Sequence, residues 1–137
     1  MVMGVHPGVL KVKQGWVDVR EVATAHLKAI ECKEAANQRF ILNSQTLWFR
    51  EIATEISEEF SPHGYPVKNN EFAYCVSRFA AYFSNEVSDM IPFWGKNYEM
   101  SNGKSKEVLG MEYRPTKESL TEMINGMIDD GVIEDMR

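Results

Sequence analysis

The sequence predicts a helix-rich α+β domain, and three observations lead to this fold class. Hydrophobic residues make up 44% of the 137 residues, which is enough for one core of ordinary size. Apolar residues recur at helical spacing in roughly five segments of the chain. Only about three short segments have the apolar pattern of a strand, and a stable sheet needs at least that many strands paired under a covered face. The strands are therefore expected to depend on further structure around them.

The chain is expected to begin with an irregular segment at residues 1–14, because two glycines and a proline interrupt any regular element there. The folded domain is then predicted over residues 15–137. Its first elements are a short strand at residues 16–19 and a helix at residues 20–32.

Asp18 and Glu21 have the spacing of a capping box at the start of this helix. In such a box each side chain accepts a hydrogen bond from a backbone amide that the first turn leaves free. The apolar stripe of the helix consists of Val22, Ala25, His26, Ala29 and Ile30. His26 is therefore predicted to lie on the buried face, as a packed side chain rather than a catalytic base or a metal ligand. The small alanines beside it predict close approach of another element.

Residues 39–43 are predicted to form a strand buried on both faces, as in a parallel sheet, because apolar residues stand at consecutive positions. Four further helices are predicted by apolar spacing and by the turn residues between them, at residues 47–60, 72–83, 104–109 and 116–130. Thr46 is expected to cap the first of these four helices. The aromatic residues from Phe72 to Phe93 mostly fall at helical spacing and are predicted to be core.

The composition excludes several classes of function. The net charge of −5 and the lack of a basic run argue against a nucleic-acid partner. No apolar stretch is long enough to span a membrane, and no secretory signal is evident, so a cytoplasmic location is expected. Cys32 and Cys75 are interpreted as small buried residues in a reducing compartment rather than as a disulfide. Because the chain lacks CxxC and HxxxH pairs, no metal site is predicted.

Six segments follow one another at intervals typical of one enzyme family, and they are VDVREVATAHLKAI, RFILN, TLWFREIATEISEEFSPHGYP, FAAYFSNEVSDMIPFWGK, SNGKSKEVLGMEYRPT and SLTEMINGMIDDG. Together they resemble the C-terminal portion of an extended short-chain dehydrogenase/reductase. The subgroup they resemble is dihydroflavonol 4-reductase and its relatives, within the NAD-dependent epimerase/dehydratase group. The resemblance covers residues 15–131, which is nearly the whole chain.

The resemblance implies a C-terminal substrate domain together with the last strand and helix of a doubly wound, Rossmann-type α/β fold. In this family a larger N-terminal part holds NADP or NAD on a glycine-rich turn and carries a serine and a Tyr-x-x-x-Lys pair. The implied activity is hydride transfer between the nicotinamide and a carbonyl or CH–OH group of a small, largely apolar molecule. This sequence contains no glycine-rich turn of that kind. The chain alone is therefore expected to bind no cofactor and to be inactive, as a segment of a larger reductase.

One Tyr-x-x-x-Lys match does occur, from Tyr113 to Lys117. In the family the two side chains share one face of a helix, where the ammonium lowers the pKa of the tyrosine. Pro115 stands between them, removes a helical donor and keeps Arg114 out of helical geometry. The match is therefore interpreted as coincidence, and no catalytic residue is predicted in this chain.

The predicted substrate-pocket residues are Gln14, Gly15, Trp16 and Tyr65. The resemblance places the segment from Gln14 to Trp16 beside the substrate, although Trp16 fits a core position equally well. Tyr65 lies in a loop dense in proline and glycine, where binding residues are common. The alternative function is a stand-alone binding or interaction module without catalysis. In that case the unpaired edge of the strand at residues 39–43 would favour self-association.

Overall fold

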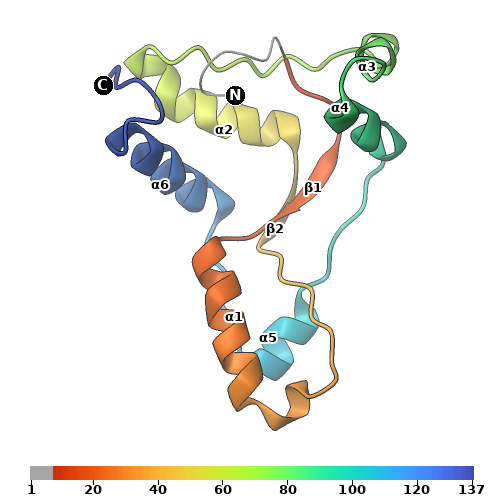
Figure 1. The fold of residues 1–137 in the computed structure, drawn as a ribbon, viewed down its shortest axis with the longest axis vertical. Coiled ribbons are helices and arrows are strands. Elements are labelled where there is room, and N and C mark those ends of the chain that lie inside the picture. The colour runs from red at the N-terminus through yellow and green to blue at the C-terminus, as the bar shows by residue number, and fades with distance from the viewer. Residues whose placement is uncertain (1–7) are drawn as a thin grey trace.

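The computed structural model describes residues 8–137 and confirms a helix-rich α+β fold (Figure 1). Its helices and strands are β1 (Lys13–Trp16), α1 (Val19–Glu31), β2 (Gln45–Trp48), α2 (Phe49–Phe60), α3 (Tyr74–Ala80), α4 (Asn85–Met90), α5 (Gly103–Leu109) and α6 (Thr116–Asp129). Short 3₁₀ turns lie at Lys33–Ala35, Ser61–His63 and Ile91–Phe93. The irregular segment predicted for residues 1–14 falls partly outside the described residues.

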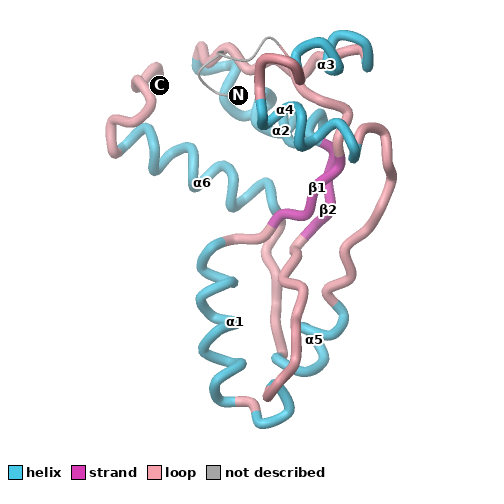
Figure 2. The backbone as a smooth tube through the Cα atoms, turned by 45° about the vertical axis from the view of Figure 1, so that its right-hand side comes forward, coloured by secondary structure: helices cyan, strands magenta, loops and turns pink. Residues whose placement is uncertain are grey.

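A two-stranded antiparallel ladder lies at the centre of the molecule, between two groups of helices (Figures 1 and 2). Lys13 is opposite Trp48 and Trp16 is opposite Gln45. Helices α1 and α5 lie beyond one end of the ladder, while α2, α6, α3 and α4 lie around the other. The elongated molecule therefore has two separate hydrophobic cores.

The larger core is formed mainly by α2 and α6. The apolar stripe predicted for α2 is confirmed, because the spacing of its apolar residues places them on one face. The stripe predicted for α6 is confirmed only in part, since Met123 and Met127 were expected on it and are 49% and 38% exposed. The buried members of this core are Ile52, Ile56, Phe60, Tyr65, Leu120, Ile124, Ile128 and Ile133. Trp16 and Leu47 from the two strands pack against it and join the ladder to the helices.

The smaller core lies between α1 and α5. Its buried members are Ala25, Ala35, Leu109 and Met111. Ala25 is only 2% exposed, so the predicted close approach to α1 is confirmed, and the approaching element is α5. Gly110 ends α5 in the left-handed region with φ of 59°, a conformation that suits glycine.

The strand predictions were wrong in position. The first strand begins at Lys13, three residues before the predicted strand at 16–19. Residues 39–43 form an extended loop, and the second strand follows at Gln45–Trp48. A strand requires a hydrogen-bonding neighbour, and within residues 8–137 no strand lies beside 39–43. Thr46 is therefore a strand residue and does not cap α2, whose cap is Trp48.

The burial of His26 was also predicted wrongly. His26 is exposed, and its Nδ1 contacts the carbonyl oxygen of Val22 in its own helix at 2.7 Å. Ile30, predicted on the same buried stripe, is 83% exposed. The alanine face of α1 meets α5, and within the described residues nothing covers the adjacent face that carries His26 and Ile30.

The aromatic residues of α3 and of the turn between α3 and α4 are a second case of unexpected exposure. Phe79, Tyr82 and Phe83 are 69%, 85% and 80% exposed, although helical spacing predicted them to be core. The helix predicted at residues 72–83 is shorter, at Tyr74–Ala80, and α4 follows after a turn. Both helices are too short to bury a full apolar stripe against the rest of the fold.

Candidate functional site: a cavity beside Trp16

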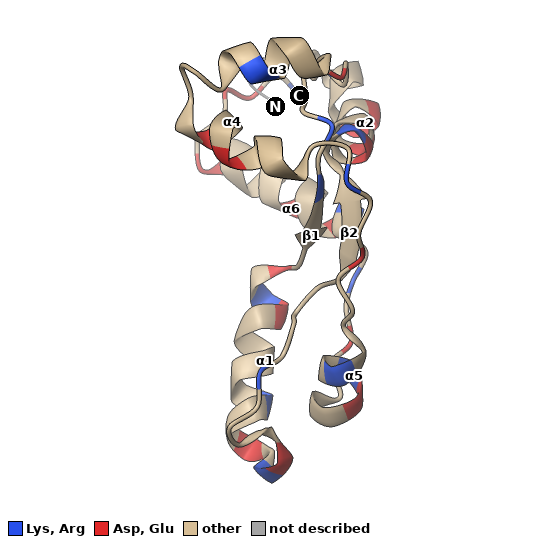
Figure 3. Cartoon of the chain, turned by 90° about the vertical axis from the view of Figure 1, so that its right-hand side faces the viewer, with Lys and Arg blue, Asp and Glu red and all other residues tan. Residues whose placement is uncertain are grey.

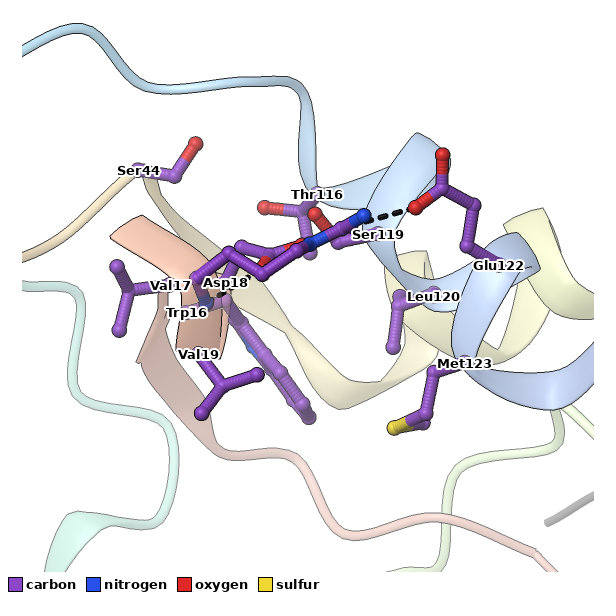
Figure 4. A pocket seen from close by; sticks show the side chains of 11 residues that line it. Trp16, Val17, Asp18, Val19, Ser44, Thr116, Ser119, Leu120, Glu122 and Met123 are labelled. Atoms are coloured by element: carbon purple, nitrogen blue, oxygen red, sulfur yellow. Dashed lines mark hydrogen bonds and ion pairs between the residues drawn. The ribbon is translucent and has the colours of Figure 1, made fainter. Parts of the chain in front are cut away.

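A cavity of about 530 Å³ lies where the end of β1, the start of α1 and the first half of α6 meet (Figure 4). Most of its wall is apolar, and polar side chains stand at its rim. The lining residues are Trp16, Val17, Asp18, Val19, Arg20, Ser44, Thr116, Ser119, Leu120, Glu122 and Met123. This volume is in the range that proteins use to bind small molecules.

Trp16 is fixed in this wall by the fold around it. The ladder pairs it with Gln45, and its ring meets Phe49 edge to face with 6.3 Å between centroids. Its backbone carbonyl oxygen accepts a hydrogen bond from the amide of Ser44 at 2.7 Å. The indole is therefore both a part of the core and a wall of the cavity, so the two roles considered from sequence coexist.

Two buried polar groups of the lining lack partners. The indole Nε1 of Trp16 and the hydroxyl Oγ1 of Thr116 are both buried, and neither has a hydrogen-bond partner in the described part of the chain. Thr116 as a whole is only 4% exposed. Leaving such a group unsatisfied costs about 1–3 kcal/mol. A ligand atom that reached either group after a small movement of the lining would recover part of that cost.

The rim carries a network of charged side chains. Asp18 caps α1 by accepting a hydrogen bond from the amide of Arg20 at 2.8 Å, as the sequence predicts. The guanidinium of Arg20 donates to Asp18 at 2.6 Å and to Glu122 of α6 at 2.5 Å. These hydrogen bonds from Arg20 hold the pKa of Asp18 well below its usual value. The network joins the start of α1 to the middle of α6 at the edge of the cavity.

Glu21 does not complete the predicted capping box. Its carboxylate instead accepts a hydrogen bond at 2.6 Å from the backbone amide of Arg114, just before α6. The Arg114 guanidinium also lies 3.6 Å from the same oxygen. A partner 93 residues away in sequence has replaced a local one, so spacing alone could not reveal this contact.

For proton transfer the lining offers only two carboxylates, those of Asp18 and Glu122. It contains no histidine, cysteine, lysine or tyrosine. Asp18 stays ionised because its pKa is lowered, and it is already bound by Arg20. The Glu122 carboxylate also accepts a hydrogen bond from Arg20, so both carboxylates of the lining are engaged by one guanidinium. The cavity can bind and orient a molecule through apolar contact and hydrogen bonds.

The four predicted pocket residues fall in different places. Trp16 lines the cavity. Gly15 lies next to it on β1, where an added Cβ would come within 2.7 Å of the Asn43 side chain, and Gln14 is exposed on the same strand. Neither Gln14 nor Gly15 is among the residues that line the cavity.

Tyr65 lies in the larger core and not in the lining of the cavity. It is 2% exposed, and its hydroxyl donates to the carbonyl oxygen of Glu134 at 3.1 Å and accepts from the amide of Met136 at 3.0 Å. The geometry therefore gives it a clear role in holding the C-terminal segment against α2.

Sequence reasoning missed the contribution of α6 to the cavity. Thr116, Ser119 and Met123 lie about one hundred residues after Trp16, and no short motif connects them. The predicted apolar stripe of α6 includes Leu120 and Met123, so the sequence indicates that this side of the helix faces the fold but not that it lines a cavity.

The Tyr-x-x-x-Lys match is divided between two elements. Tyr113 lies in the extended segment before α6, and Lys117 lies in the first turn of that helix, with Pro115 at its cap. The hydroxyl of Tyr113 is within 2.8 Å of the Ser105 hydroxyl. The two residues thus do not share a helical face, in agreement with the interpretation of the match as coincidence.

Within residues 8–137 no group of three or more histidine, cysteine, aspartate or glutamate side chains lies together in a way that could hold a metal ion. In the same range no helix combines the length and the apolar character needed to cross a membrane.

Comparison with known proteins identifies reductases as relatives. The chain is 30% identical to cinnamoyl-CoA reductase 1 of Petunia hybrida over 118 residues, which are 86% of this chain and 29% of that enzyme. It is 28% identical to the ketoreductase azaE of Aspergillus niger over 114 residues, which are 83% of this chain and 29% of that protein. The chain is similar to a portion of these reductases. No protein-family model matches it.

Two solved structures have the same fold over a part of their length. The structure of Gre2 from Candida albicans matches with a TM-score of 0.61 and 25% identity, covering 90% of this chain and 32% of that chain. The structure of gox2253 matches with a TM-score of 0.72 and 18% identity, covering 97% and 42%. The predicted resemblance to the short-chain dehydrogenase/reductase and epimerase/dehydratase group is thus confirmed. The chain spans less than a third of the length of the two curated relatives.

Proposed function

We propose that this chain is the substrate-binding portion of an NAD(P)-dependent reductase that acts on a carbonyl or CH–OH group of a small, largely apolar molecule. The cavity beside Trp16 supports this proposal most directly, because its apolar wall contains two buried polar groups without partners. An apolar molecule with one hydrogen-bonding oxygen would fill the wall and bond to one or both groups. The similarity to reductases supports the class of chemistry.

The two polar groups suit both forms of such a substrate. The indole Nε1 of Trp16 is only a donor, so it fits the oxygen of a carbonyl or of an alcohol. The hydroxyl of Thr116 can donate to a carbonyl oxygen and can accept from an alcohol. Both atoms are buried, so the proposed binding of either form includes a small shift of the side chains that cover them.

The same cavity does not fit a dinucleotide. Phosphates need positive charge or free backbone amides. Arg20 is the one cation in the lining, and it is already bound by Asp18 and Glu122. The two carboxylates would repel phosphate groups. We therefore place the cofactor and the proton donor in a nucleotide-binding portion that the residues described here do not form.

The open face of α1 is a suitable surface for that portion. Val19, Leu27 and Ile30 are 78%, 65% and 83% exposed, and their spacing places them along one side of the helix. The cavity opens beside Val19, which lines it. A nucleotide-binding portion packed on this face would cover the apolar side chains and close the cavity over the substrate.

Calorimetric titration with an aromatic methyl ketone tests the cavity. We expect saturable binding to the unmodified chain and binding about 3- to 10-fold weaker in Thr116→Val, which keeps the shape of the side chain but removes its hydroxyl. Thr121→Val makes the same chemical change on α6 outside the lining and should leave the affinity unchanged. Equal affinity in the unmodified chain and both variants would contradict the proposed site.

Titration with NADPH, followed by tryptophan and nicotinamide fluorescence, tests the division of roles. We expect no saturable binding and no oxidation of NADPH when the ketone is also present. Saturable binding to the chain alone would refute the proposal that the cofactor is held elsewhere.

The alternative function, a binding module without catalysis, is compatible with the same cavity because every lining residue comes from this chain. Adding the separately produced nucleotide-binding portion of a related reductase distinguishes the two functions. The proposed function predicts NADPH-dependent reduction of the ketone in the mixture, whereas a binding module would show ketone binding and no turnover.

A further inference from the structure

The junction of α3 and α4 carries an exposed patch of three aromatic side chains, Phe79, Tyr82 and Phe83, called here the aromatic patch. Their exposed fractions are 69%, 85% and 80%. The rings of Phe79 and Phe83 meet edge to face with 5.4 Å between centroids, so they form one cluster. At about 150–250 Å² per aromatic side chain, these fractions leave on the order of 450 Å² open to solvent. A patch of that size is comparable to the largest apolar patch of a typical monomer, which is often a functional surface.

The two helices beside the aromatic patch carry opposite charges. Arg78 lies on α3, whereas Glu86 and Asp89 lie on α4, and all three are exposed. Figure 3 shows the basic residue on α3 and the acidic residues on α4. Within residues 8–137 none of the three makes an ion pair, so all three charges are free to meet another molecule.

We propose that the aromatic patch is a two-fold interface between two copies of this chain, with α3 of each copy on α4 of the other. A two-fold axis between α3 and α4 places α3 of each copy against α4 of the other. The basic helix of one copy then faces the acidic helix of the second. Arg78 of each copy would then lie opposite Glu86 and Asp89 of the other. The surface is self-complementary in both its apolar centre and its charged rim, as an isologous interface must be.

The available area fits a weak or moderate dimer. A standard interface buries roughly 800 Å² on each partner. The aromatic patch supplies about half of this, and Tyr74, Val76 and Phe93, each about half exposed, lie on α3 or in the turn that follows α4. An anionic membrane would be a poor occupant, because the net charge of the chain is −5 and α4 is acidic.

This interface differs from the strand edge that the sequence suggested for self-association. It also shares no residue with the cavity beside Trp16. The proposed dimer is therefore independent of the proposed substrate site.

Size-exclusion chromatography with light scattering over a range of concentrations tests the interface. We expect a concentration-dependent rise toward twice 15.7 kDa, with a dissociation constant in the micromolar range. Phe83→Glu should weaken association at least tenfold, since it places charge in the centre of the patch. Ile30→Glu is the matched control, because Ile30 is 83% exposed on α1, and it should leave the dissociation constant unchanged.

Charge reversal tests the orientation of the two copies. Arg78→Glu should weaken association several-fold by placing like charges opposite one another, and Asp89→Arg combined with it should restore about half of the loss, because Glu86 still faces the new glutamate. A chain that is monomeric at every concentration would overturn the proposal. Equal effects of Phe83→Glu and Ile30→Glu would overturn the location, and failure of the double variant to recover would overturn the proposed pairing.

Discussion

At the start of α1, the carboxylate of Asp18 has three roles in the structure. It caps the helix through the amide of Arg20, it binds the Arg20 guanidinium, and it borders the cavity. The sequence predicts the cap because Asp at this position is a local signal. The ion pair with Glu122 at the far side of Arg20 depends on the packing of α6, so no local pattern could predict it.

Replacing Asp18 by Asn should lower the free energy of unfolding by about 1 kcal/mol at pH 7, because Asn keeps the cap but loses the charge. The folded pKa of Asp18 lies below the usual value near 3.8, so its charge stabilises the folded state most above that pH. The advantage of the unmodified chain should therefore shrink as the pH falls below about 4. Urea unfolding from pH 7 to pH 3 measures this, and a difference that does not change with pH would contradict the role of the charge.

His26 offers a second test at the level of one residue. Because its side chain is exposed and contacts only its own helix, His26→Ala should change the free energy of unfolding by less than about 0.5 kcal/mol. Ala25→Leu, which inserts bulk between α1 and α5, should cost about 1–3 kcal/mol. Thermal unfolding followed by circular dichroism compares the two variants. A larger loss for His26→Ala would indicate that this side chain is packed, as the sequence pattern suggested.

Among the elements, α2 and α6 depend most on each other. Ile124 is 2% exposed in the core between them, whereas Met127, one turn later on α6, is 38% exposed. We expect Ile124→Ala to cost about 2–5 kcal/mol and Met127→Ala less than about 1 kcal/mol. Chemical unfolding of the two variants measures the contrast. Similar losses for both would mean that α6 packs in another rotation.

Helical elements were more predictable than strands for a physical reason. The stripes of α2 and α6 follow from side-chain spacing within one helix, so a window of sequence contains the whole signal. In the ladder, each residue of β1 pairs with a residue of β2 about thirty positions later in the chain. This pairing decides where β1 begins and ends, and it starts the strand earlier than the local pattern predicted. The apolar run at residues 39–43 has the composition of a strand, but no strand lies beside it within the described residues.

Exposure of predicted core residues has a related cause. Phe79 and Phe83 have helical spacing, and spacing reveals which residues share a face but not what that face meets. The same holds for Ile30 on α1. In both helices the apolar side is consistent with contacts made to another part of a larger assembly, which the proposals above assign to a second copy and to a nucleotide-binding portion.

For the molecule as a whole, the sequence predicted only part of the lining of the cavity. Trp16 was identified from the sequence, whereas Thr116 and Met123 were not, because they reach the cavity only when α6 folds back over the strands. The chain thus lines the cavity with residues 16–20, Ser44 and the first half of α6. It does so with similarity to reductases over less than a third of their length.

The most direct test of the central claim follows the indole N–H resonance of Trp16 by ¹⁵N-correlated NMR during titration with an aromatic methyl ketone. The unsatisfied Nε1 should move downfield as it donates to the ketone oxygen, and the peak should be identified by its loss in Trp16→Phe. The indole of Trp94, which packs against Tyr74 and lies outside the lining, serves as the internal reference. A saturable shift of the Trp16 peak with a static Trp94 peak is the predicted result, and a Trp16 peak that stays fixed at saturating ketone would contradict the account.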